Sequence, residues 1–322
     1  MKSTDLNSKW DEITSVKDKN GYQALRISST CIPDLFIAVD TAGHRCLLLF
    51  LSEDVRVRTK GKTKNNLILS YFPSKRLLSI ELKDFDFNDL FNDLVLSIYS
   101  KVKTITDSES ASEEFASAFN KWSVFFDDIP SSKLTQEQVQ GLFGELFVLD
   151  EFLRRANSLN INATLRAWKG LYDASNDFEF AQKNVEVKTK EETRLFVKIS
   201  SEFQLEEELD KGLELRVISV VFDLIEGKSI HDLIKGIIQC TRSKGGDLGI
   251  IYHALSQKEL TVEAFKEYNN YRFGVKNSKT YDCTIIGFPK LSSANIPNQI
   301  SSLTYDLRVS ALSQFLIEER KY

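Results

Sequence analysis

The sequence predicts an α/β core, in the order helix, strands, helix and strand, preceded by an antiparallel β-rich domain. Short, partly alternating apolar runs with turn residues between them fill residues 1–84, as is typical of strands. Apolar residues then recur at helical spacing from Val139 to Leu153. The continuous apolar run LRVISVVFDL, residues 215–224, suits a strand that is buried on both faces.

The β-rich domain consists of short apolar runs, for which an antiparallel sheet or a small barrel is the simplest arrangement. The runs are GYQALRIS, LFIAVDTAG, RCLLLFLS, VRVRTK, NLILSYF and RLLSIELKD. From Phe85 the pattern becomes helical, with Leu90, Leu94 and Ile98 four residues apart, and the polar segment TDSESASEE interrupts it. We therefore expect three parts: a β-rich domain at 1–84, a helical connector at 85–132, and the core with a C-terminal extension at 133–322.

Local sequence signals predict where the helices and strands of the core lie. Thr135 and Gln138 have the spacing of a capping box, and Ser229 with Asp232 begins a second helix in the same way. Between the two helices we expect strands near 165–168, 177–180, 185–190 and 194–199, and a short helix at 202–211. The chain is expected to end on a helix in ALSQFLIEER, residues 311–320.

The composition narrows the class of protein. No stretch of eighteen apolar residues and no hydrophobic signal region occur, so we expect a soluble, cytoplasmic protein with no membrane partner. The net charge of −4 argues against a chain coated in positive charge, although one basic stripe can coexist with an acidic site. The four cysteines lack zinc-ligand spacing and are expected as reduced thiols in the core. With only three histidines, a metal would be held mainly by carboxylates, which favours Mg²⁺ or Mn²⁺.

The segment DFEFAQKNVEVKTK, residues 177–190, places charged side chains on one face of a predicted hairpin. Side chains alternate along a strand, so Glu186 and Lys188 project together. The same rule puts Asp177 and Glu179 together on the preceding strand, while the polar AQKN between the strands closes a turn.

The pairing of the two strands decides which charges face each other. If Phe180 pairs with Val185, Asp177 lies opposite Lys188, and the two glutamates of the hairpin lie opposite each other. Like charges directly opposite each other on a sheet are destabilising, and a divalent cation between the carboxylates would remove that cost. The alternative is a solvated hairpin face that binds nothing.

The helix before the hairpin adds a third carboxylate. Gly141 and Gly144 lie inside this helix, where each glycine costs about 1 kcal/mol relative to alanine, so we expect them to let another backbone approach. Glu145 shares a face with Gly141 and has apolar neighbours, where a carboxylate is costly unless it is paired or metal-bound. The alternative is a glutamate at the edge of the apolar face that pairs with a lysine.

Three segments together carry a family resemblance. GLFGELFVL, WKGLYDASNDFEF and VEVKTK, within residues 141–204, resemble the active-site series of the PD-(D/E)xK nuclease superfamily. The chain resembles in particular a bacterial group of restriction-associated PD-(D/E)xK motif proteins of uncharacterised function. The resemblance implies a restriction-endonuclease-like core with a mixed sheet.

The resemblance also implies roles for individual residues. Asp177 and Glu186 would be metal ligands, and Glu145 would be a helix-borne ligand of the same or a second metal. Lys188 would position or activate the attacking water, or stabilise the charge that develops on the phosphate. Gln204, in SSEFQL, resembles a polar residue that some resolvase-like members place near the site, and we group it with the nucleic-acid contacts.

One residue of the motif departs from the family pattern, and one nearby residue could be mistaken for a member of the motif. Asn176 stands where the name of the motif has proline. Asp173 is close enough in sequence to be confused with Asp177, but only Asp177 precedes an apolar strand residue in the expected way.

A stripe of basic residues is the second candidate site. Arg56, Arg58, Lys60, Lys62 and Lys64 recur at every second position with no acidic residue between them. In an extended strand they would all face one way and could follow a phosphate backbone, although Gly61 suggests a turn. The alternative is a solvated hairpin.

The expected function is that of a Mg²⁺-dependent deoxyribonuclease, an endonuclease that hydrolyses phosphodiester bonds, with Mn²⁺ as a substitute cofactor. The resemblance places it in restriction or phage defence, with DNA and other proteins of such a system as partners; a homodimer is also compatible with it. One alternative is a catalytically silent DNA-binding or scaffolding subunit that keeps the nuclease fold. Another is an unrelated interaction protein with a chance ExK tripeptide.

Overall fold

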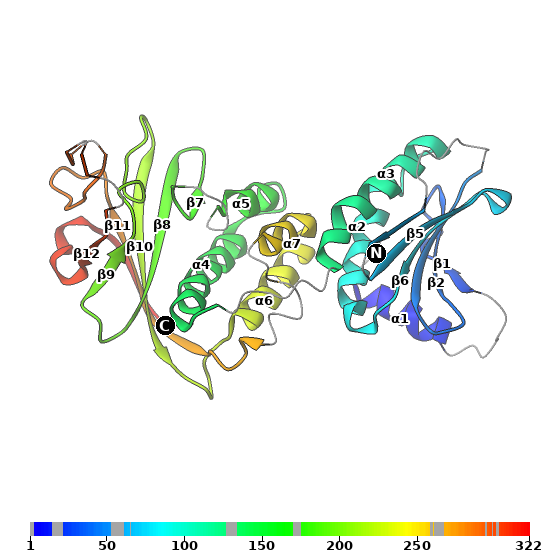
Figure 1. The fold of residues 1–322 in the computed structure, drawn as a ribbon, viewed down its shortest axis with the longest axis horizontal. Helices are drawn as coiled ribbons and strands as arrows, with labels where there is room; N and C mark the ends of the chain where they lie inside the picture. The colour runs from blue at the N-terminus through cyan, green and yellow to red at the C-terminus, as the bar shows by residue number, and fades with distance from the viewer. Residues whose placement is uncertain are drawn as a thin grey trace. The chain divides into compact units, whose positions relative to one another are not determined.

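The computed structural model describes residues 3–14, 22–52, 61–64, 66–126, 134–169, 175–257, 260, 267–293, 295–297, 299–300 and 303–322. The chain divides into two compact units, Met1–Pro130 and Ser131–Tyr322. Each unit has its own sheet and its own helices, so each is described by itself (Figure 1).

The first unit is built on an open antiparallel sheet with the strand order β1-β2-β3-β6-β5-β4. The sheet settles the choice that the sequence left between a sheet and a small barrel. Its strands are β1 (Gln23–Arg26), β2 (Asp34–Val39), β3 (Arg45–Phe50), β4 (Lys62–Lys64), β5 (Leu67–Phe72) and β6 (Leu77–Leu82). Its helices are α1 (Ser3–Thr14), which was not predicted, α2 (Asn88–Val102) and α3 (Ser108–Trp122).

The segment expected as a helical connector, residues 85–132, contributes α2 and α3 to the first unit. Leu90, Leu94 and Ile98 are buried, as their spacing predicted, and α2 contacts both β3 and α1. The polar segment TDSESASEE, which was expected to interrupt the helical pattern, instead begins α3. The Asp107 side chain caps this helix by accepting a hydrogen bond from Ser110 N at 2.7 Å.

The second unit contains a mixed five-stranded sheet with the order β13-β11-β10-β8-β7. Its strands are β7 (Phe178–Glu179), β8 (Lys183–Glu191), β10 (Gly212–Phe222), β11 (Phe273–Asp282) and β13 (Leu316–Lys321). The strands β8 and β10 are parallel and the other neighbours are antiparallel. The helices α4 (Gln136–Arg155), α5 (Ile161–Ala167), α6 (Ile230–Ser243) and α7 (Leu248–Ser256) lie on one side of this sheet (Figure 1).

A two-stranded ribbon, β9 (Phe196–Ile199) with β12 (Tyr305–Arg308), lies on the other side of the sheet (Figure 1). The ribbon packs its apolar face on a core cluster, to which Val197, Ile199 and Leu307 contribute together with Leu215 and Val217 of β10. Short 3-10 turns complete the described elements: Pro73–Lys75, Phe85–Phe87, Ser123–Phe126, Val309–Ala311 and Ser313–Phe315.

The helix α4 is fixed at its start and along its length. Both reciprocal hydrogen bonds of the predicted capping box between Thr135 and Gln138 are present, at 2.9 and 3.3 Å. A Cβ on Gly144 would lie 1.8 Å from Thr189 Oγ1, so this glycine is what lets α4 sit directly on β8. Gly141 has no heavy atom within 4 Å of its ideal Cβ position, so the expected close approach holds for Gly144 and is wrong for Gly141.

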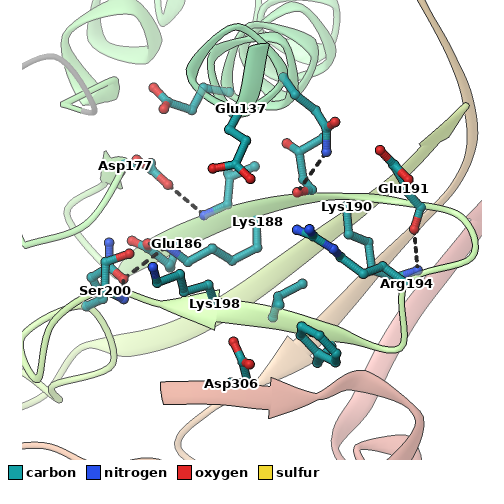
Figure 2. A pocket seen from close by; sticks show the side chains of 18 of the residues that line it. Glu137, Asp177, Glu186, Lys188, Lys190, Glu191, Arg194, Lys198, Ser200 and Asp306 are labelled. Carbon is teal, nitrogen blue, oxygen red and sulfur yellow. Dashed lines mark hydrogen bonds and ion pairs between the residues drawn. The ribbon is translucent and has the colours of Figure 1, made fainter. Parts of the chain in front are cut away.

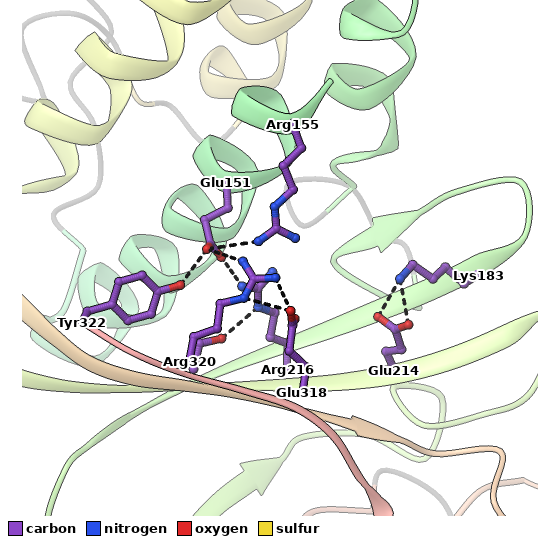
Figure 3. Close-up of polar contacts among 9 residues, drawn as sticks. Glu151, Arg155, Lys183, Glu214, Arg216, Glu318, Arg320 and Tyr322 are labelled. Atoms are coloured by element: carbon purple, nitrogen blue, oxygen red, sulfur yellow. Dashed lines mark hydrogen bonds and ion pairs between the residues drawn. The ribbon is translucent and has the colours of Figure 1, made fainter. Parts of the chain in front are cut away.

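A polar network holds α4 against the far strands of the sheet (Figure 3). The Glu151 carboxylate of α4 accepts hydrogen bonds from Arg216 of β10, from Arg320 of β13 at 3.2 Å, and from the hydroxyl of Tyr322 at 2.6 Å. Arg216 is buried and also donates to Ser278 Oγ at 3.0 Å. Because removal of one member would leave a buried charge without its partner, this network fixes the position of the helix.

Three predicted elements are wrong. Residues 165–168 form the end of α5 and not a strand, although Trp168 makes an isolated β-bridge with Phe178. Residues 202–211 form turns and not a helix. Within 311–320 two 3-10 turns lead into β13, whose alternate residues are exposed and which pairs with β11 at the edge of the sheet.

Within the part of the chain that the structure describes, no helix has the length and apolar character needed to cross a membrane.

Candidate active site

A cleft of about 1050 Å³ lies beside the exposed edge of β8. The short strand β7 pairs with only two residues of β8, Val185 and Asn184, so the later part of β8 runs on beyond it. The helix α4 borders the cleft on one side of β8, and the ribbon β9–β12 borders it on the other (Figure 2). Asp177, Glu186 and Lys188 all line this cleft.

The hairpin forms, but its register differs from the expected one. Phe178, and not Phe180, pairs with Val185. The shift of two residues keeps every side chain on its predicted face and brings Asp177, not Glu179, to the level of Glu186. The rings of Phe178 and Phe180 both pack edge-on against Phe152 of α4, at 5.3 and 5.2 Å between centroids, which supports the hairpin in this register.

Asp177 is held by the backbone of the neighbouring strand. Its Oδ2 accepts a hydrogen bond from Val187 N at 2.7 Å, so the carboxylate continues the pairing with β8 where β7 has not yet begun (Figure 2). A charge-assisted bond of this kind fixes the orientation of the carboxylate toward the cleft.

Glu186 is the most deeply buried acidic group of the cleft, with 1% of its surface exposed. Burial, reinforced by the nearby Asp177 carboxylate, raises the pKa of Glu186 to about 8. Lys188 and Asn176 oppose the rise by donating hydrogen bonds, and the distance from Lys188 Nζ to Glu186 Oε1 is 2.8 Å. Two carboxyl groups are therefore held side by side in a place that disfavours two negative charges.

Lys188 lies between the acidic groups and a loop. Its Nζ donates to Gln204 Oε1 at 3.0 Å, and the same oxygen accepts a hydrogen bond from Ser200 N at 2.8 Å. Burial by itself lowers the pKa of Lys188, but three of the carboxylates that line the cleft, led by Glu186, outweigh burial and raise it. The ammonium group therefore carries its charge at neutral pH.

Glu145 lines the same cleft from α4 but is oriented by a different partner. Its Oε2 accepts a hydrogen bond from Trp168 Nε1 at 3.1 Å. Among the described residues, Glu145, Asp177 and Glu186 do not bring ligand atoms within 4.8 Å of one another as a set of three. The neighbouring acidic pair is thus the partly exposed Asp177 with the buried Glu186, and Glu145 is a more peripheral carboxylate that still acts electrostatically on Lys188.

Asn176 and Gln204 connect the motif to the loop behind it. Asn176 is 3% exposed, and its Nδ2 donates to the backbone oxygen of Gln204 at 2.7 Å. In the sequence, Asn176 stands out only as a departure from proline. In the structure, its amide donates to the loop that carries Gln204, which a proline could not do. The contribution of Trp168 was missed altogether, because no local pattern indicates that its indole reaches Glu145.

Other charged side chains line the cleft beyond the predicted set. Figure 2 shows Lys198 of β9 beside the pair Glu186 and Lys188, with Arg194 at the turn between β8 and β9. Glu137 of α4 and Asp306 of β12 face the cleft from opposite walls (Figure 2). The cleft therefore mixes acidic and basic groups.

The basic stripe is described only in part. Arg56, Arg58 and Lys60 lie outside the described residues, as does Asp173. Lys62 and Lys64 form the exposed edge strand β4, where Lys62 Nζ donates to Asn120 Oδ1 at 3.2 Å.

A second group of metal-capable side chains, Asp40, His44 and Glu81, lies in the first unit. His44 Nδ1 is 3.0 Å from Asp40 Oδ2, and Asp40 Oδ1 also accepts from two backbone nitrogens of the β2–β3 turn. Lys83 forms an ion pair with Glu81. The three side chains therefore have partners within the protein: Asp40 and His44 bond within the turn, and Glu81 pairs with Lys83.

A mixed sheet backed by a helix, with an acidic pair and a lysine where β8 runs on beyond the short edge strand β7, is consistent with a PD-(D/E)XK nuclease-like fold. Residues 6–310 match the family described as "Putative PD-(D/E)XK family member, (DUF4420)". The chain belongs to this family, which confirms the resemblance drawn from the motif and extends it over nearly the whole chain. No curated protein and no solved structure matches it.

Proposed function

We propose that the protein is a metal-dependent DNA endonuclease that uses Mg²⁺, with Mn²⁺ as a substitute. The observation that carries the proposal is the buried Glu186 beside Asp177, with Lys188 Nζ 2.8 Å from Glu186 Oε1 and all three side chains lining one cleft. A solvated hairpin face, the alternative drawn from the sequence, does not account for a glutamate with 1% exposure.

The residues fit an oxygen-preferring divalent cation. The donor groups in the cleft are carboxylates, with no histidine or cysteine among its lining residues. Asp177 and Glu186 would hold the metal, because their proximity disfavours two negative charges until a cation lies between them. Glu145, on the α4 wall, is the third carboxylate that would contribute to a one- or two-metal site.

When bound, the metal supplies a nucleophilic water at neutral pH and neutralises charge on the phosphate. The protein groups then have separate tasks. Asp177 is oriented by Val187 N and Glu186 by Asn176, so the carboxylates are held before substrate arrives. Lys188 keeps a positive charge beside them, where it can stabilise the phosphate as negative charge develops or orient the attacking water.

The biological role we propose is restriction or phage defence, with DNA and other proteins of such a system as partners. Its support is the likeness to restriction-associated proteins and membership of a PD-(D/E)XK family. Duplex DNA in unmodified and modified forms is therefore the first substrate to offer.

The test is cleavage of long duplex and single-stranded DNA by the purified full chain, with Mg²⁺, Mn²⁺ or a chelator. We expect cleavage with either metal and none with the chelator. Cleavage that persists in the chelator would reject the metal-dependent mechanism. Binding of DNA without cleavage under every metal condition would favour the alternative of a silent DNA-binding subunit.

A further inference from the structure

The ribbon β9–β12 presents two different faces. On β9, Val197 and Ile199 are buried in the core cluster, while Phe196 and Lys198 are exposed. Alternation along a strand places Phe196 and Lys198 together on the outer face. Because Phe196 lies on the outer face, it is not buried in the core cluster, and 40% of its surface is exposed.

Cations surround this phenylalanine. The register puts Arg308 of β12 directly opposite Phe196, and Arg308 is exposed. The guanidinium carbon of Arg194 lies 6.0 Å from the centre of the Phe196 ring. Lys198 is two residues further along β9, opposite Asp306. An exposed aromatic ring thus lies between Arg194 and Lys198 along the outer face of β9, and Asp306 is the acidic residue opposite Lys198.

The outer face of the ribbon is a wall of the cleft that holds the acidic pair. Arg194, Phe196 and Lys198 all line that cleft together with Glu186 and Lys188. In Figure 2 β9 runs alongside β8, with Arg194 at one end of the cleft and Lys198 close to Lys188 at the other. A nucleic acid whose phosphate reaches Lys188 would therefore pass along this wall.

We propose that Arg194, Phe196 and Lys198 form a binding wall for single-stranded nucleic acid, with Phe196 as a stacking platform for an unpaired base; this inference rests on the proposed nuclease function. Cations alone would bind the backbone of a duplex and of a single strand. A base within a duplex has both faces covered by its neighbours, so only an unpaired base can stack on Phe196. The favoured substrate is therefore one with unpaired bases beside the phosphate that is cleaved.

The test compares two probes with the full-length protein in a chelator, so that binding is measured without cleavage. The probes are a fluorescein-labelled polythymidylate strand and a labelled duplex whose two ends are both closed by polyethylene glycol linkers, so that it has no unpaired base and no open end, and both are followed by fluorescence anisotropy. Phe196→Ala should weaken binding of the single strand by about 5- to 100-fold and leave duplex binding within about twofold. Phe196→Trp should keep the affinity for the single strand.

Two further variants separate stacking from folding and from charge. Phe196→Leu keeps an apolar side chain without a ring and should bind the single strand as weakly as the alanine variant. Lys198→Ala should flatten the salt dependence of single-strand binding by about 0.7 in log–log slope, because the variant neutralises one phosphate fewer. Phe222→Ala, at another exposed phenylalanine that does not line the cleft, is the control and should change the binding of neither probe.

Two outcomes would overturn the inference in different ways. If the wild type binds and cleaves DNA but Phe196→Ala leaves both probes unchanged, or weakens both equally, the stacking platform is wrong and the nuclease function stands. If the wild type binds neither probe and cleaves nothing, the proposed function and the inference fail together.

Discussion

Gln204 is the residue through which a loop outside the motif reaches the lysine of the cleft. Its Oε1 accepts from Lys188 Nζ at 3.0 Å and from Ser200 N at 2.8 Å, so the position of the amide is fixed by the backbone. Lys188 is thereby held between Gln204 and Glu186 instead of pairing with one acid alone. We therefore expect Gln204 to act through Lys188, as a positioning residue, while its predicted contact with nucleic acid stays a prediction.

Gln204→Ala should lower kcat for cleavage by about 10- to 100-fold, as is common when a supporting hydrogen bond is removed from an active-site group. The KM should change little, because the amide is bonded to Lys188 and Ser200 and the expected loss lies in the orientation of the lysine. Steady-state cleavage kinetics measure both constants. Gln182→Ala, in the turn of the same hairpin and outside this cleft, is the matched control. An unchanged kcat would remove Gln204 from the mechanism.

At the residue scale, sequence reasoning succeeded where the motif carries the information. Asp177, Glu186 and Lys188 are local to one hairpin, so alternation alone places them on the correct faces. Asn176 and Trp168 act through contacts with Gln204 and Glu145 that lie far away in sequence. Such contacts leave no periodic signal, and the roles of the predicted residues in metal binding and catalysis stay predictions.

At the scale of elements, the packing of α4 on β8 depends on one of two glycines. A Cβ at Gly144 would collide with Thr189, whereas a Cβ at Gly141 would meet no neighbouring atom within 4 Å. The two positions lie in the same helix and are three residues apart, so their helix propensities are equal. Any difference in unfolding free energy between an alanine variant at Gly144 and one at Gly141 therefore measures the contact of α4 with β8.

Gly144→Ala should lower the free energy of unfolding by about 1–3 kcal/mol, because the added methyl overpacks the contact with Thr189. Gly141→Ala should raise the free energy of unfolding by up to about 1 kcal/mol through helix propensity. Urea unfolding of the two single variants beside the wild type measures both changes. Equal shifts in the two variants would show that α4 does not sit directly against β8.

The errors at this scale have a common cause. The segments 165–168, 202–211 and 311–320 are short, and over so few residues the spacing of apolar side chains does not separate a strand, a helix and a turn. The hairpin register also slipped by two residues, because a shift of two keeps the same side chains on the same face. The capping boxes of α4 and α6, by contrast, are local chemistry and were predicted correctly.

At the scale of the molecule, the chain combines a sheet-and-helix unit with a nuclease-like unit. The spacing of apolar residues predicted the mixed α/β character but could not show that α2 packs on the first sheet, because tertiary contacts decide which elements pack together. The first unit also carries the basic stripe, whose role in binding stays a prediction.

Replacing Arg56, Arg58 and Lys60 by alanine should weaken duplex binding and flatten its salt dependence by up to about 0.9 in log–log slope for each phosphate that the variant no longer neutralises. Anisotropy titrations from low to moderate salt measure the slope. The control replaces three exposed lysines elsewhere in the same unit: Lys75, Lys103 and Lys121. A slope equal to that of the control variant would return the stripe to the solvated-hairpin interpretation.

Asp177 and Glu186 are proposed to hold a metal ion, and Lys188 is proposed to stabilise the phosphate or to orient the attacking water. The most direct measurement pairs Mg²⁺-dependent DNA cleavage with calorimetric Mn²⁺ binding for Lys188→Ala and Glu186→Ala, with Lys183→Ala of the same strand as the control. We expect Lys188→Ala to lose most cleavage, about 100-fold or more, with metal affinity nearly intact, and Glu186→Ala to lose both. Cleavage that survives both substitutions would contradict the account and place the chemistry elsewhere.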